Sequence, residues 1–104
     1  MHLIISTTSK CSKTLETIKE KILQNNLSPC IQTYKNIFSE YIWKSKIEET
    51  KEIKIEIKTH VSLKGKIVEI IKKHHNCECP EIILQKIELI DDEYGEWFNK
   101  HLNI

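Results

Sequence analysis

The residues with the clearest capacity for chemistry lie together in one short segment of the chain. Two imidazoles and two thiols fall within six residues, at His74, His75, Cys77 and Cys79. Imidazole nitrogen and thiolate sulfur are ligand types that suit copper and zinc. If this segment is extended, Cys77 and Cys79 project to the same side and bring two sulfur atoms near one ion. The pattern therefore indicates a metal site.

The same residues also fit an ordinary structural interpretation. Structural zinc sites usually draw their ligands from two separated pairs, and this segment lacks the spacing of a CxxC pair. His74 can complete the apolar stripe of a helix, and His75 can end that helix. The two cysteines then pack as small apolar side chains. Metal binding and simple packing both stay open on the residue pattern alone.

Other reactive side chains form weaker patterns. Cys11 falls near the expected start of a helix, where the backbone dipoles lower the pKa of a thiol. Glu78 and Glu81 flank Pro80 and, together with Lys58, have the residue types of acid–base catalysis. Such catalysis also needs a pocket and a third positioned group, neither of which the pattern indicates. We therefore expect structural pairing of these charges and no enzymatic activity.

Composition restricts the partners of the chain. Its 104 residues include 16 Lys and 15 acidic residues but no Arg, for a formal net charge of +1. The two signs are interspersed rather than gathered into a basic block, which argues against nucleic acid as a partner. Without a guanidinium group, Arg-clamped binding of phosphate is excluded.

The same composition bears on domain number and compartment. No run of about 18 apolar residues is present to cross a membrane. Met1–Ser6 contains too short an apolar run for the core of a secretory signal. We expect a cytoplasmic protein with reduced cysteines and no membrane partner. The length suits one domain, residues 1–104.

Hydrophobic patterning predicts the elements that must position these residues. Leu3–Ile5 are apolar on both faces, which indicates a strand in the interior of a sheet. A helix follows, with apolar residues at helical spacing from Leu15 to Ile22 and with Ser9 or Ser12 available as its cap.

Two strands are predicted in the middle of the chain. Cys30–Trp43 is rich in β-branched and aromatic residues and predicts one long strand, with Lys35 and Asn36 as a bulge or bend. A polar connector is expected at Lys44–Lys51. Residues 53–58 then alternate between isoleucine and charged side chains, the pattern of a strand with one face in water.

The last third of the chain predicts two helices and a strand. Ser62 can cap a second helix whose apolar residues form a single stripe. Pro80 excludes any continuation of helical structure and precedes a strand at Ile82–Leu89. Asp91 or Asp92 can cap a short closing helix.

This order predicts an α+β fold of the ferredoxin-like βαββαβ type with an added C-terminal helix. Both main helices then cover one face of the sheet, so the other face is either solvated or buried by another subunit. Tyr41 and Trp43 at the end of a long strand favour burial, because an exposed edge with aromatic residues promotes pairing. We therefore expect an oligomer.

Several motifs in the same order resemble those of the CutA, or divalent-cation tolerance, family. The segment from Tyr41 to Glu49, YIWKSKIEE, is close to the family pattern YxWKGKIEE, and His75–Glu81 is similar to the family HPYExPE. The other matches are Thr7-Thr8 at the end of the first strand, Ile57-Lys58-Thr59, and the pair Tyr94 and Trp97. The resemblance covers essentially the whole chain.

The resemblance implies a tight homotrimer, with an architecture similar to that of the PII signalling proteins, that binds copper or other divalent metal ions in the cytoplasm and contributes to metal tolerance. Some bacterial relatives have a Cys among their copper ligands where Thr7 stands here, and a hydroxyl is a poor replacement for a thiolate at a soft metal. The accompanying His-His pair matches His74 and His75. We therefore predict His74, His75 and Cys77 as the metal ligands, with Cys77 as a local substitute for the missing Cys.

A second function is compatible with the same resemblance. A PII-like trimer can act as a signalling or scaffold module whose clefts between subunits accept a small ligand or a partner protein. A shared fold alone does not distinguish this role from metal handling.

Overall fold

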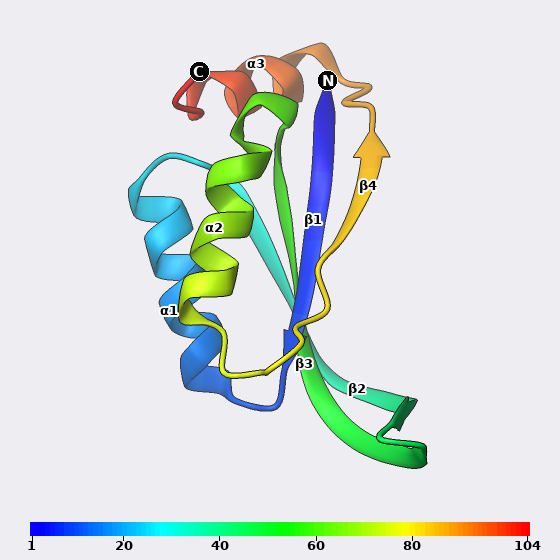
Figure 1. The fold of residues 1–104 in the computed structure, drawn as a ribbon. Helices are drawn as coiled ribbons and strands as arrows, with labels where there is room; N and C mark the ends of the chain where they lie inside the picture. The colour runs from blue at the N-terminus through cyan, green and yellow to red at the C-terminus, as the bar shows by residue number, and fades with distance from the viewer.

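The computed structural model describes all residues 1–104 and arranges them as a four-stranded sheet with three α-helices (Figure 1). The elements are β1 (His2–Ser9), α1 (Ser12–Gln24), β2 (Cys30–Trp43), β3 (Lys46–His60), α2 (Lys64–His74), β4 (Ile83–Ile87) and α3 (Asp92–Lys100). The strand order is β2-β3-β1-β4, and all neighbouring strands are antiparallel. The predicted α+β, ferredoxin-like arrangement is confirmed. None of the helices has the length and apolar composition that crossing a membrane requires.

β1 is a central strand, as its apolar character predicts. Ile5 pairs with Ile57 of β3 on one side and with Leu84 of β4 on the other. Ile5 and Ile57 are almost completely buried, and so are the polar residues Ser6–Ser9 that end the strand. The C-terminal end of β1 therefore provides a firmly held backbone next to the loop that follows α2.

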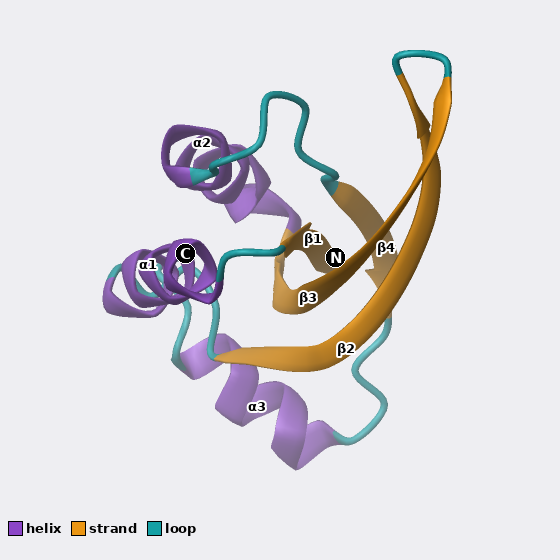
Figure 2. Ribbon diagram, turned by 90° about the horizontal axis from the view of Figure 1, so that it is seen from below, coloured by secondary structure: helices purple, strands orange, loops and turns teal.

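α1 and α2 lie side by side on one face of the sheet, with α3 set apart from them (Figures 1 and 2). Each of the two packs with one apolar stripe. α1 buries Leu15, Ile18 and Ile22, and α2 buries Ile67 and Ile71. These stripes form the core with the isoleucines of β1 and β3. The packing fixes the end of α2, where the predicted metal ligands begin.

β2 and β3 form a long hairpin whose tip extends away from the rest of the fold (Figure 2). Lys44 and Ser45 connect the strands, and both have left-handed φ values, 51° and 65°. Two successive left-handed residues form the tight turn whose twist matches that of paired strands. The predicted connector Lys44–Lys51 is therefore wrong after Ser45. β3 already begins at Lys46, because the tight turn places Lys46 opposite Trp43.

A bulge divides the hairpin into two parts, as predicted. The pairing register of β2 shifts between Tyr34 and Ile37, and Asn36 has a left-handed φ of 62°. A bulge bends the strand and increases its twist. The part of the hairpin before the bulge belongs to the sheet, and the part after it continues to the projecting tip.

The N-terminal ends of α2 and α3 were each predicted to have a capping side chain. The carboxylate of Asp91 accepts a hydrogen bond of 2.9 Å from the backbone N–H of Tyr94 and caps α3 as predicted. The prediction that Ser62 caps α2 is wrong. Ser62 lies inside a single 3₁₀ turn, Val61–Leu63, and its own N–H donates to the side chain of His60.

Two further boundaries differ from the predictions. Neither predicted serine caps α1, which follows Cys11 directly; the Ser9 hydroxyl accepts from the Cys11 N–H at 3.0 Å. β4 spans Ile83–Ile87 instead of Ile82–Leu89. Its pairing with β1 is limited to residues His2–Ser6 of that strand, and no other strand lies on its outer edge to extend the ladder.

Candidate metal-binding loop and the hairpin cleft

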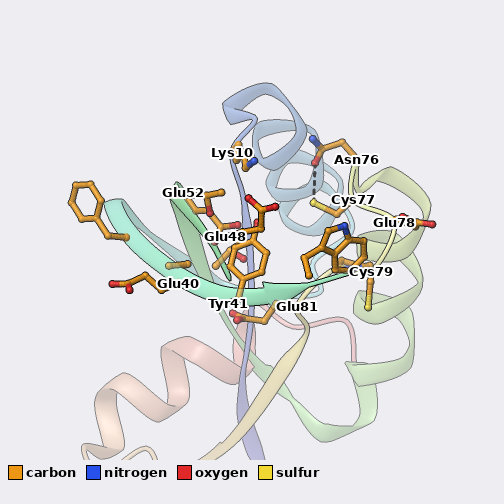
Figure 3. A pocket seen from close by; sticks show the side chains of 16 residues that line it. Lys10, Glu40, Tyr41, Glu48, Glu52, Asn76, Cys77, Glu78, Cys79 and Glu81 are labelled. Carbon is orange, nitrogen blue, oxygen red and sulfur yellow. Dashed lines mark hydrogen bonds between the residues drawn. The ribbon is translucent and has the colours of Figure 1, made fainter. Parts of the chain in front are cut away.

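The residues between α2 and β4 form one wall of a cavity, and the β2–β3 hairpin forms the other. We call residues 75–82 the metal loop and the cavity the hairpin cleft; its volume is about 880 Å³. Cys77 and Cys79 line it from the loop, and Tyr41 and Trp43 line it from the hairpin (Figure 3). Thiols and aromatic side chains that are far apart in the sequence therefore share one cavity.

Carboxylates dominate the polar lining of the hairpin cleft. Five of them face it, from both walls: Glu40, Glu48, Glu52, Glu78 and Glu81. Lys10 is the one positively charged side chain in the lining. The excess of negative charge attracts cations to the cleft.

Sequence reasoning missed the three hairpin members of this carboxylate set. Glu48 lies in the segment that the sequence predicted as a connector, so its place on a strand was not recognised. The available signal was the sequence Trp43-Lys44-Ser45-Lys46, in which two adjacent polar residues separate strand-forming residues.

Hydrogen bonds to the C-terminal end of β1, and one within the loop, hold the first residues of the metal loop. Nδ1 of His75 accepts from the backbone N–H of Cys77 at 3.0 Å, which leaves the ring proton on Nε2 in the neutral form. Nε2 then donates to the Thr8 carbonyl at 2.8 Å. The Ser9 hydroxyl donates to Oδ1 of Asn76, also at 2.8 Å. Both ring nitrogens of His75 are therefore occupied.

Replacing His75 with Ala is expected to lower the free energy of unfolding by about 1–3 kcal/mol, the usual cost of leaving partly buried polar groups without partners. The Thr8 carbonyl and the Cys77 N–H both lose their contact. Urea titration measures the change. His74→Ala is the matched control, because the adjacent imidazole makes no hydrogen bond in the structure, and an equal loss in both variants would contradict the anchoring role.

His74 lies away from the hairpin cleft. It is the last residue of α2 and lines a separate hollow of about 220 Å³ with Lys21, Glu69 and Lys73. His75 is tied to β1, and Cys77 faces the cleft. The structure thus places the three predicted ligands in three different surroundings, and no group of three or more His, Cys, Asp or Glu side chains is positioned to hold one ion.

The two thiols of the loop also do not project to one side. The argument for a common side assumed an extended segment, but Cys77–Cys79 form consecutive bends. Figure 3 shows the Cys77 sulfur turned toward Asn76, whose Oδ1 lies 3.9 Å away, and the Cys79 sulfur turned away from it. Both residues are exposed, so both sulfurs are accessible from solvent.

The surroundings of Cys77 and of Cys11 shift the pKa values of the two thiols in opposite directions. Partial burial raises the pKa of the Cys77 thiol, the Glu52 carboxylate raises it further, and Lys10 offsets part of this rise. At the start of α1, hydrogen bonds from the hydroxyl and the backbone N–H of Thr14 lower the pKa of Cys11. The prediction of a lowered Cys11 pKa is confirmed, although the Thr14 hydroxyl is the largest cause.

Cys11 is therefore expected to react with iodoacetamide severalfold faster than Cys77 near pH 7, because the thiolate is the nucleophile. Mass spectrometry of timed digests measures the two rates. Thr14→Val removes the hydroxyl with little change of shape and is expected to slow Cys11 alone. Faster modification of Cys77 than of Cys11 in the unaltered protein would contradict the assignment.

The chain is similar to one family over nearly its whole length. The model of the family described as CutA1 divalent ion tolerance protein matches residues 3–101. The divalent-cation tolerance protein CutA of Escherichia coli (strain K12/DH10B) is 27% identical over 99 residues, which are 95% of this chain and 88% of that protein.

Solved structures show the same similarity in three dimensions. CutA1 from Pyrococcus horikoshii superimposes with a TM-score of 0.89 at 25% identity and covers 98% of this chain and 99% of its own. A CutA structure from Archaeoglobus fulgidus, described as a periplasmic divalent cation tolerance protein, gives a TM-score of 0.90 at 26% identity with coverages of 97% and 98%.

Proposed function

The chain belongs to the CutA1 divalent ion tolerance family, and from that premise we propose that it binds copper, among other divalent metal ions, as a cytoplasmic homotrimer that contributes to metal tolerance. The ion is what the protein carries, and the role is binding rather than catalysis. The predicted ligands, His74, His75 and Cys77, remain our proposal for the site.

One observation gives the strongest support for metal binding at the hairpin cleft. Two exposed thiols, Cys77 and Cys79, line a cleft together with five carboxylates and one lysine. The carboxylates raise the local concentration of cations, and thiolate sulfur retains copper in preference to harder ions. The combination suits an ion that is first attracted by charge and then held by sulfur.

Binding by the proposed ligands requires the metal loop to change conformation. His75 can offer a nitrogen only after its bond to Thr8 or to the Cys77 N–H breaks. The loop contains no helix or strand between His75 and Ile82, so few other backbone bonds oppose the change. We expect copper to shift the backbone amide resonances of residues 75–79 and of Thr8 together.

The proposal of a trimer is supported by apolar side chains that the single subunit leaves in solvent. Five of them lie on the projecting hairpin: Phe38, Tyr41, Ile42, Trp43 and Ile47. A group of large exposed apolar residues on one element is typical of an interface between subunits. Aromatic residues are enriched in such interfaces, so the hairpin has both the exposure and the composition of one.

Calorimetric titration of the reduced protein with Cu(I), Cu(II) and Zn(II) tests the metal role. We expect copper to bind with about −8 kcal/mol or better, a sub-micromolar affinity. The affinity should be lost in a variant with His74→Ala, His75→Ala and Cys77→Ser. Cys30→Ser is the matched control, because this thiol is remote from the loop in the sequence and does not line the cleft. Weak binding that persists in the triple variant would overturn the proposed ligands.

Copper affinity is expected to fall as the pH falls, because protons compete with the ion for imidazole and thiolate. The raised pKa of Cys77 makes the loss begin at a higher pH than for an ordinary thiol. Glu52→Gln removes a charge that raises this pKa, so the pH of half-maximal binding should move downward. Titrations over a pH series measure the shift, and a shift upward in Glu52→Gln would contradict the explanation.

A second candidate function is a trimeric module that binds a small ligand or a partner protein in clefts between subunits. The hairpin cleft favours it, although one subunit forms this cavity by itself, because the exposed hairpin that borders the cavity is also the proposed interface. A volume of about 880 Å³ and an aromatic lining suit an organic ligand. A thermal-shift screen distinguishes this role. Stabilisation by a compound that survives loss of His74, His75, Cys77 and Cys79 would support the module and make metal binding incidental.

A further inference from the structure

The face of the β2–β3 hairpin that borders the hairpin cleft differs from the face that carries the most exposed isoleucines. Tyr41 pairs with Glu48 across the two strands, and both line the cleft. Trp43 also lines it, because side chains two positions apart on a strand project to the same side. Ile42 and Ile47 pair with each other and do not line the cleft. The cleft-facing side chains are therefore separate from this isoleucine pair.

The carboxylates of the cleft have no ion-pair partners within the subunit. Glu48 and Glu52 line it from the hairpin, and Glu78 and Glu81 line it from the metal loop (Figure 3). The structure contains two ion pairs, and neither includes any of these four side chains. Lys10 lines the same cavity but forms no ion pair either. The negative charge of the cleft is therefore left for a cation from solution to neutralise.

These carboxylates do not converge on one point. No group of three or more His, Cys, Asp or Glu side chains is positioned to hold a metal ion. A calcium or magnesium ion needs its oxygen ligands within roughly 2.0–2.6 Å of one centre. Carboxylates spread over two walls instead match a ligand whose positive charges are also spread, because each charge then lies near a different carboxylate. A chain that carries several ammonium groups has this distribution of charge.

The aromatic and hydroxyl groups of the cleft suit the same kind of ligand. Tyr41 and Trp43 both line the cavity. Aromatic rings attract ammonium groups electrostatically, and they also pack against the methylene groups that join them. Thr50 lines the cavity as well, and its buried Oγ1 has no hydrogen-bond partner. An ammonium group has only donors, so it can supply the hydrogen bond that this oxygen lacks.

We propose that the hairpin cleft binds an aliphatic polyamine, a flexible chain of methylene groups with two or more ammonium groups. The inference rests on the second candidate function, a module that binds a small ligand, and it names the class of that ligand. A cavity of about 880 Å³ is large enough for such a chain. Anionic ligands are disfavoured, because five carboxylates repel them and Lys10 is the one opposing charge in the lining.

The alternative is that the carboxylates are only solvated and attract cations in general. General attraction depends on the net charge of the surface and is screened by salt. It makes no distinction between one face of the hairpin and the other, or between one amine with several charges and an equal number of charges on separate amines. A bound polyamine requires both distinctions.

Calorimetric titration of the full chain with spermidine, in metal-free buffer at fixed ionic strength, tests the site. We expect Glu48→Gln and Glu52→Gln each to weaken binding about tenfold, because each removes a charged hydrogen-bond acceptor. Glu49→Gln is the matched control. It removes the same charge from the position next to Glu48 on β3, but Glu49 does not line the cleft. Its affinity for spermidine should stay close to that of the unaltered protein.

Two further comparisons test the ligand class and the aromatic wall. n-Butylamine, with one ammonium group, is expected to bind about tenfold or more weakly than spermidine. Trp43→Leu should weaken spermidine binding severalfold, as expected when a cation–π contact is lost. Trp97→Leu is its control, because Trp97 is 43% exposed but lies outside the cleft. Sedimentation of each variant shows whether a change in binding accompanies a change in assembly.

Equal weakening in Glu48→Gln and Glu49→Gln would overturn the site, and so would equal affinity for spermidine and n-butylamine. Absence of spermidine binding to the unaltered protein would overturn it as well. Failure here is distinguishable from failure of the proposed functions. Copper titration depends on the metal-loop ligands and uses no amine, and a different compound that stabilises the protein in the thermal-shift screen would still support the ligand-binding module.

Discussion

The double substitution Ile42→Lys with Ile47→Glu is expected to reduce the mass in sedimentation equilibrium from three times 12.3 kDa to the 12.3 kDa of one chain. Ile42 is 76% exposed and Ile47 is 81% exposed in the single subunit. If the hairpin packs against neighbouring subunits, these two side chains lose their solvent contact there. Charged groups placed in such an interface lose hydration without compensating partners.

The design keeps the hairpin itself intact. Ile42 and Ile47 are paired directly across the two strands, next to the turn. Opposite charges at a cross-strand pair attract one another, whereas two like charges would destabilise the hairpin as well as the interface. A change in mass is then attributable to assembly rather than to local unfolding.

Ile90→Lys is the matched control for this experiment. Ile90 is 83% exposed, so its apolar surface is as accessible as that of the hairpin pair, but it lies between β4 and α3. We expect this variant to retain the mass of the unaltered protein. Sedimentation of the unaltered protein as a single chain, or of the double variant as a trimer, would contradict the hairpin interface.

Phe98→Ala is expected to lower the free energy of unfolding by about 3–5 kcal/mol, the range for removing a large buried aromatic side chain. Phe98 is completely buried and belongs to the core cluster with residues of α1, α2 and the sheet. Its ring also packs against two others: the centroid of the Phe98 ring lies 5.2 Å from that of His2 and 6.0 Å from that of Tyr94. The cavity left by the substitution therefore affects α3 and the start of β1 together.

Trp97→Ala provides the comparison, because Trp97 is the neighbouring aromatic residue but is 43% exposed. Its removal should cost clearly less than that of Phe98. Both values are measured by urea unfolding at one fixed chain concentration, since the stability of an oligomer depends on concentration. An equal or larger loss in Trp97→Ala would show that α3 is held by its outer face instead of by Phe98.

The order of elements was predictable because the buried face of a helix or strand requires apolar residues at a regular spacing in the sequence. The apolar stripes of α1 and α2 and the double-sided apolar character of β1 follow directly from side-chain spacing. The first half of β3 was not predictable in this way. Its residues are exposed, so it is held by backbone pairing with β2 and by the turn at Lys44 and Ser45, and neither depends on burial.

The candidate site was predictable in composition but not in geometry. The sequence shows two imidazoles and two thiols within six residues. It does not show that His75 bonds to Thr8, which is 67 positions away, or that Glu52 from another strand faces Cys77.

The sequence by itself therefore determined the family motifs, the α+β order of elements and the supply of soft ligands, because each of these depends on residue type and short-range spacing. The tertiary structure alone decided which ring nitrogens of His75 are hydrogen-bonded, which thiol has a raised pKa and which carboxylates share a cleft. Hydrogen-bond partners, burial and charge at a site come from residues distant in the chain, and only the folded arrangement brings them within range.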